Sequence, residues 1–136
     1  MSSEVGSAKE TVLAVDGSDF LRQLGPELLR SGFQLEVLES FSTRCLAGPG
    51  RPVAALVRCP HSLNQFARTC QQIREEAPDM PLVVLSPRTD VETKLLLFEM
   101  GADDFVEEPF AVEELIARLR SIIRSRKQTA VKGLRV

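Results

Sequence analysis

Four polar side chains occupy positions in this sequence where several groups could act together in one site. Asp16, Arg58, Ser86 and Glu108 each lie just past a short apolar run. Such runs are typical of strands buried on both faces of a parallel sheet. Ligand sites in such sheets form at the carboxyl ends of the strands, so we expect these side chains to share one edge. Two carboxylates, a guanidinium and a hydroxyl are suited to ion pairing and hydrogen bonding.

The sequence contains no other pattern that predicts catalysis or metal binding. His61 is the single histidine, and a lone histidine in a loop is most simply a solvated side chain. Cys45, Cys59 and Cys70 have no CxxC or Cys/His spacing, which favours free reduced thiols. Neither GxxxxGK[ST] nor GxGxxG occurs. We therefore expect no catalytic residue, no metal site and no cofactor.

The spacing of apolar residues predicts five strands that alternate with five helices. The predicted strands are 11–15, 33–38, 53–57, 82–85 and 105–106. The predicted helices are 20–29 with a break at Gly25-Pro26, 41–47, 65–76, a helix to residue 100 with a capping box at Thr89 and Glu92, and 112–125. The short connections predict right-handed crossovers. The expected fold is α/β, a flavodoxin-like (βα)5 doubly wound parallel sheet with strand order 2-1-3-4-5.

The totals are those of one globular domain. The chain has 136 residues, of which 43% are hydrophobic and 26% charged, and its formal net charge is −2. No apolar run approaches the roughly 20 residues of a membrane span, and no signal-peptide pattern is present. We expect a flexible N-terminal tail over 1–10, one domain over 11–125 and a linker or tail over 126–136. The expected location is the cytoplasm, without membrane contact.

A longer motif near the C-terminus is more specific than these patterns. Gly-Ala-Asp-Asp-Phe begins at Gly101, Pro109-Phe110 follows, and Glu-Leu-x-Ala-Arg-x-Arg spans 114–120. Their order and spacing resemble the end of a response regulator receiver domain (CheY-like), of the OmpR/PhoB type. The resemblance extends over about residues 11–125, and it is most specific in the second half.

The resemblance implies a phosphorylation pocket, but several of its residues are replaced here. Family members bind Mg²⁺ through two acids after strand one and accept the phosphoryl group on an Asp after strand three. They also have a Thr or Ser after strand four and a Lys before the Pro that follows strand five. The matching degenerate pocket is Asp16, Gly17 for the second acid, Arg58 for the acceptor, Ser86, Phe105 at the aromatic switch position, and Glu108 for the Lys before Pro109. One carboxylate cannot make that metal site and an arginine cannot carry an acyl phosphate, so we expect a pseudo-receiver.

Two of the replacements exchange the family's charges. The acceptor Asp has become Arg58, and the Lys that would face it has become Glu108. We predict an ion pair between them, with Asp16 as a second partner of Arg58, because guanidinium binds a carboxylate bidentately. The Glu108–Pro109 peptide bond, cis in the family, is expected to be cis here. The alternative is that both residues have become separate surface charges.

The resemblance also implies an interface between two copies of the chain. The charged set comprises Lys94, Glu99, Asp104, Glu114, Arg118 and Arg120. In OmpR/PhoB-type receivers such residues join protomers across a two-fold axis. The implied pairs are Lys94 with Glu114, Asp104 with Arg118, and Glu99 with Arg120. Glu114 and Arg118 are also four residues apart on one predicted helix, so an intrahelical pair is the alternative.

Three functions follow, from different classes. The first is a non-enzymatic, phosphorylation-independent receiver domain of a transcription regulator, which homodimerises through the fourth helix, fifth strand and fifth helix. It could be linked to a DNA-binding domain outside this chain, and it needs no small-molecule substrate. The second is a free-standing adaptor that binds a protein partner through the same face. The third is an active phosphoacceptor that uses an unexpected residue. A reading frame that continues past Val136 would favour the first over the second.

Overall fold

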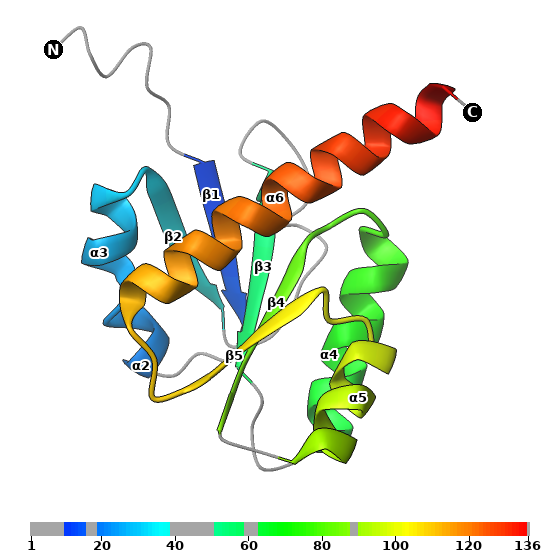
Figure 1. Cartoon of the computed structure of the whole chain (residues 1–136). Coiled ribbons are helices and arrows are strands. Elements are labelled where there is room, and N and C mark those ends of the chain that lie inside the picture. The colour runs from blue at the N-terminus through cyan, green and yellow to red at the C-terminus, as the bar shows by residue number, and fades with distance from the viewer. Residues whose placement is uncertain (1–9, 16–18, 39–50, 59–62, 88–89, 136) are drawn as a thin grey trace, which may run out of the picture.

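The strands form one parallel sheet in the order β2-β1-β3-β4-β5 (Figure 1). The computed structural model describes residues 10–15, 19–38, 51–58, 63–87 and 90–135. The strands are Glu10–Val15 (β1), Phe33–Leu38 (β2), Ala54–Arg58 (β3), Leu82–Pro87 (β4) and Asp104–Glu108 (β5). The predicted α/β fold and strand order are confirmed, and each strand ends within two residues of its expected bounds.

Helices cover both faces of the sheet (Figure 1). They are Asp19–Arg22 (α2), Gly25–Arg30 (α3), Leu63–Glu76 (α4), Val91–Glu99 (α5) and Val112–Arg135 (α6). One core cluster joins the sheet to α2, α3 and α6, and the other joins it to α4 and α5. The fold is therefore a three-layer sandwich with a separate apolar core on each side of the sheet.

Alternation along each strand assigns its side chains to the two cores. On β1, Val12 and Ala14 belong to the α2/α3/α6 cluster, whereas Leu13 and Val15 belong to the α4/α5 cluster. Because successive side chains of a strand point to opposite faces, the continuous apolar runs of the sequence supply both cores. The same alternation decides which helix each polar residue of β5 can reach.

The first predicted helix is divided as its Gly-Pro pair indicated. α2 ends at Arg22, and α3 begins at Gly25 with Pro26 in its first turn, where its missing N–H costs no helical hydrogen bond. The predicted cap of α5 is one residue out of place. Asp90, not Thr89, is the N-cap, and its carboxylate accepts from the Thr93 N–H. The predicted helix over 41–47 lies outside the described residues.

The last helix is longer than the sequence predicted. α6 has 24 residues and continues to Arg135, whereas the apolar spacing predicted an end near Ser125. At 1.5 Å per residue it is about 36 Å long, and its C-terminal turns extend past the sheet (Figure 1). Among its described side chains, Leu115, Ile116, Leu119 and Ile123 are buried. The end was missed because residues beyond this apolar stripe have helical propensity without a core pattern. Within the described ranges, no helix is long and apolar enough to cross a membrane.

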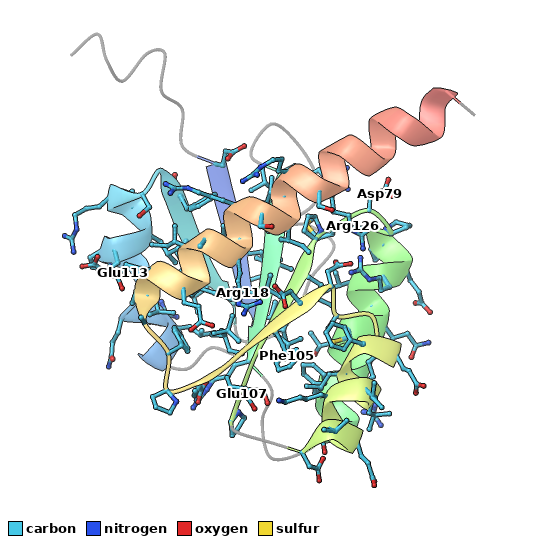
Figure 2. All side chains as sticks on the ribbon, in the orientation of Figure 1. Asp79, Phe105, Glu107, Glu113, Arg118 and Arg126 are labelled. Carbon is cyan, nitrogen blue, oxygen red and sulfur yellow. The ribbon has the colours of Figure 1, made fainter. Side chains whose placement is uncertain are left out.

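An arginine joins several turns at the amino ends of β4 and β5. Arg74 donates to the carbonyl oxygens of Pro78, Met80 and Gly101 and to the Asp103 carboxylate. Asp103 also accepts from the Leu82 N–H at 2.8 Å and pairs with Arg126 of α6 (Figure 2). This Arg74–Asp103 network therefore ties α4, both turns and α6 to one end of the sheet.

Candidate functional site: the carboxyl edge of the sheet and the face of its last strand

Arg58 and Glu108 form a bidentate ion pair at the carboxyl edge of the sheet. Arg58 Nε donates to Glu108 Oε2 at 2.9 Å, and Arg58 Nη2 donates to Glu108 Oε1 at 3.1 Å. The two side chains are 33% and 16% exposed. The predicted exchange of charges has therefore produced a direct contact, and the alternative of two separate surface charges is wrong.

The sheet explains why these two residues can meet. Each is the last residue of its strand, and β4 lies between the two strands. Their backbones are thus about 10 Å apart, twice the usual spacing of neighbouring strands. Leu56 and Val106, two residues earlier on each strand, belong to the α2/α3/α6 core, so alternation directs both long side chains to that face. A pair of shorter side chains could not span the end of β4.

The predicted pocket residues on the other face are arranged differently. Ser86 is buried and its hydroxyl donates to the Pro87 carbonyl oxygen at 2.8 Å. Phe105 is half-buried against the α4/α5 core. The Phe98 ring meets the Phe105 ring in an edge-to-face contact with centroids 5.4 Å apart. Ser86 and Phe105 thus lie on the α5 side of the sheet, and the ion pair lies on the α6 side.

The remaining pocket predictions have mixed outcomes. Asp16, Gly17 and His61 lie outside the described residues, so the predicted contact of Asp16 with Arg58 stays a prediction. The Glu108–Pro109 peptide bond is cis, as expected.

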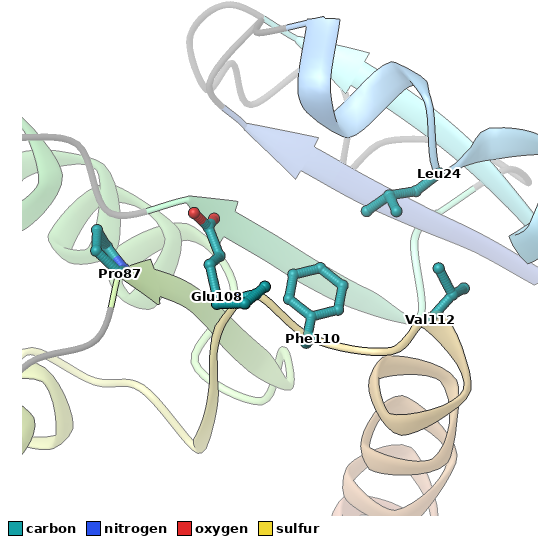
Figure 3. Close-up of a pocket in the computed structure, with 6 residues that line it drawn as sticks. Leu24, Pro87, Glu108, Phe110 and Val112 are labelled. Carbon is teal, nitrogen blue, oxygen red and sulfur yellow. The ribbon is translucent and has the colours of Figure 1, made fainter.

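A cleft opens beside Glu108. It has a volume of about 520 Å³ and is lined by Leu24, Pro87, Glu108, Pro109, Phe110 and Val112 (Figure 3). Apart from the Glu108 carboxylate, these side chains are apolar. The cleft borders the edge of the sheet where open α/β folds bind their ligands.

Arg118 of α6 pairs within its own chain. Its Nη1 donates to both Asp104 oxygens at 3.2 and 3.0 Å, and its Nε lies 3.4 Å from Glu114 Oε2. The hydrogen bonds to Asp104 raise the pKa of the Arg118 guanidinium above its ordinary value. The Asp104–Arg118 pair forms here within one chain, together with the intrahelical alternative, and the pair between two copies stays a prediction.

Lys94 of α5 has a partner that the sequence analysis did not propose. Its Nζ lies 3.4 Å from Glu107 Oε2 and 5.3 Å from the centre of the Phe105 ring. Glu107 and Phe105 alternate with Asp104 and Val106 along β5, and Phe105 faces the α5 side. Strand alternation thus directs Glu107 to α5 and Asp104 to α6. That alternation was the available signal for Glu107.

Arg120 lies on the opposite side of α6 from Arg118 and contacts the α3–β2 turn. Its Nη2 donates to the Ser31 carbonyl oxygen at 2.8 Å, and its guanidinium lies 6.0 Å from the centre of the Phe33 ring. Glu99, its implied partner in a second copy, is exposed on α5. In the single chain the predicted interface residues therefore form three separate groups: Lys94 with Glu107, Arg118 with Asp104 and Glu114, and Arg120 with the α3–β2 turn.

α5 also exposes large apolar side chains. Val91 is 67% exposed and Leu95 59%, and the exposures of Leu96 and Phe98 are 38% and 42%. A helix that is apolar on its outer face has surface left to bury against a partner.

Comparisons with known proteins agree with this architecture. The chain is 30% identical over 118 residues to the response regulator MprA of Mycobacterium leprae, a match that covers 85% of this chain and 52% of that protein. It therefore spans about half the length of the curated relatives that it matches. No protein-family model matches it.

Solved structures show the same fold. A CheY-like receiver domain from Methanospirillum hungatei superposes with a TM-score of 0.71 at 14% identity, covering 89% of this chain and 98% of that one. Response regulator DrrB of Thermotoga maritima, an OmpR/PhoB homologue, gives a TM-score of 0.67 at 23% identity, covering 86% and 54%. The chain is thus similar in sequence to response regulators, and its fold is the one seen in solved receiver domains.

Proposed function

We propose that this chain is a pseudo-receiver, a phosphorylation-independent signalling domain that acts by self-association and not as an enzyme. The observation that carries the proposal is the bidentate Arg58–Glu108 pair. It occupies the strand ends where receivers place a phosphoacceptor carboxylate and a lysine. A guanidinium cannot accept a phosphoryl group, and its positive charge opposes binding of Mg²⁺ beside it.

The proposed self-association uses the face formed by α5, β5 and α6. Two features support it: the exposed apolar side chains of α5, and charged residues of both signs on the adjoining elements. Both are suited to a two-fold interface, in which each surface must complement itself. In a longer cytoplasmic regulator, such a dimer would set the spacing of linked DNA-binding domains on paired half-sites.

The same exposed apolar face supports a second candidate, an adaptor that binds a different protein. The two candidates differ in what buries α5. A homodimer covers Val91 and Leu95 at high protein concentration in the absence of any partner, whereas an adaptor stays monomeric until its partner is added.

The chemical part of the proposal is tested by phosphorylation. The protein is incubated with Mg²⁺ and acetyl phosphate, and its intact mass is then measured. A receiver domain with Asp at the Arg58 position, treated in parallel, is the positive control. We expect no phosphate adduct on this chain. A stoichiometric adduct that hydroxylamine removes would contradict the proposal.

The assembly part is tested by Arg118→Glu. The substitution places a carboxylate beside Asp104 and Glu114, and in a two-fold dimer it acts twice. We expect the dimer dissociation constant to rise about tenfold or more, which corresponds to about 1.4 kcal/mol, in sedimentation equilibrium at low salt. Arg124→Glu, an equal charge change at an exposed position of the same helix, is the matched control. A dimer that both substitutions leave unchanged would contradict this interface.

A further inference from the structure

Glu107 forms an ion pair with Lys94, a residue of the proposed interface, within the same chain. We propose that Glu107 is an intramolecular competitor for Lys94 and thereby limits the strength of self-association. The inference rests on the proposed dimer and adds a residue that controls its stability.

Two contacts hold Lys94 on its own chain. Its Nζ lies 3.4 Å from the Glu107 carboxylate and 5.3 Å from the centre of the Phe105 ring. Lys94 and Glu107 are 31% and 33% exposed, so the pair is partly shielded from water. Phe105 also packs against Phe98 in a T-shaped ring contact. A carboxylate and an aromatic face on one strand thus form a small acceptor site for the ammonium group.

The implied partner of Lys94 in a second copy is also engaged. Glu114 lies 3.4 Å from Arg118 of the same helix. A Lys94–Glu114 pair between two copies therefore forms only when Lys94 leaves Glu107 or shares its charge with both acids. The partner within the chain has the advantage, because it is held nearby at every protein concentration.

Removal of Glu107's charge should therefore favour the dimer. An exposed ion pair contributes little free energy to association. In a two-fold dimer, however, each substitution is present twice, so its effect on the dimer is doubled. Glu107→Gln keeps the length of the side chain and removes the charge. We expect it to lower the dimer dissociation constant by roughly 2- to 30-fold at low salt. The gain should shrink in 1 M salt, where the Debye length is about 3 Å.

The experiment is sedimentation equilibrium on wild type and three variants. Glu113→Gln is the matched control, because Glu113 is an exposed acid at the start of α6, far from Phe105 (Figure 2), and its substitution changes the net charge equally. We expect a change of less than about twofold from this control. Lys94→Gln introduced together with Glu107→Gln should abolish the gain, because the competition requires the ammonium group. A single cooperative thermal transition for each variant confirms that it is folded.

The outcomes separate this inference from the proposed function. A tighter dimer for Glu107→Gln alone supports both. A monomeric wild type beside a dimeric variant supports the role of Glu107 but contradicts self-association of the unmodified chain. A dimer whose dissociation constant is unchanged or raised by Glu107→Gln overturns the role of Glu107 and leaves the dimer in place. An equal gain from Glu113→Gln also overturns it, because net charge alone then explains the effect. Wild type and variants that all stay monomeric at high micromolar concentration overturn both proposals.

Discussion

Two arginines at opposite ends of the sheet show how differently one side chain can be used. Arg74, at the amino end, donates to three backbone carbonyls and to Asp103, and so joins turns that are distant in the sequence. Arg58, at the carboxyl end, donates two hydrogen bonds to the Glu108 carboxylate beside an apolar cleft. The first arrangement belongs to the scaffold. The second occupies the edge where this fold class carries its chemistry.

The comparison implies unequal costs of substitution. Loss of Arg74 leaves several backbone carbonyl oxygens without this donor and removes one of the partners of Asp103. A buried acceptor left without a donor costs more free energy than an average hydrogen bond contributes. The Arg58–Glu108 pair is one-third exposed on the arginine side, so its loss is partly compensated by water. Stability measurements on variants of Arg74 and Arg58 can therefore test this difference between the two ends of the sheet.

The largest expected effect is that of Arg74→Met. Methionine keeps the apolar stem but donates no hydrogen bond, and we expect a loss of about 2–3 kcal/mol in the free energy of unfolding. Urea denaturation measures it. Arg68→Met, at an exposed position of the same helix, is the control and should cost no more than about 0.5 kcal/mol. Equal losses from both substitutions would show that the Arg74–Asp103 network is unimportant for stability.

A smaller effect is expected at the carboxyl end. Arg58→Asp places a second carboxylate beside Glu108, and we expect a loss of about 1–2 kcal/mol, below the cost of breaking a fully buried pair. Glu108→Lys in the same chain restores opposite charges and should recover most of the loss. Four denaturation midpoints, for wild type, both single variants and the double variant, complete the cycle. Additive effects would mean that the pair contributes no coupling energy.

The smallest effect is expected at the N-cap of α5, where the Asp90 carboxylate is exposed to solvent. The Thr93 N–H hydrogen bond lowers the pKa of Asp90 below its ordinary value. The stabilisation is therefore present above the unfolded pKa, near 3.9, and is lost as pH falls through the lower folded pKa. Asp90→Asn keeps an acceptor oxygen but does not titrate. We expect the difference in thermal midpoint between wild type and Asp90→Asn to narrow as pH falls from 6 to about 2.5. A difference that is constant with pH would contradict this.

The sequence alone was sufficient for the fold and for one contact. Apolar runs of strand length, separated by helical spacing and short turns, leave few arrangements other than a doubly wound parallel sheet. The ends of parallel strands meet at one edge, and the resemblance to receivers implies that the residues at these two positions face each other. Arg58 and Glu108 could therefore be paired although 50 positions separate them. Their exchanged charges then made an ion pair the expected result.

Other features were decided only by the tertiary structure. Arg74 binds mainly backbone carbonyl oxygens. Because every residue has such an oxygen, no side-chain pattern in the sequence predicts its partners. Lys94 pairs with Glu107 because alternation along β5 turns that acid toward α5, and the sequence offered several nearby acids. Arg120 binds the Ser31 carbonyl because α6 packs on the sheet close enough for its side chain to reach the α3–β2 turn. The sequence determines which elements form and which ends they share. The choice among similar partners depends on strand parity and helix packing, which exist only once the chain is folded.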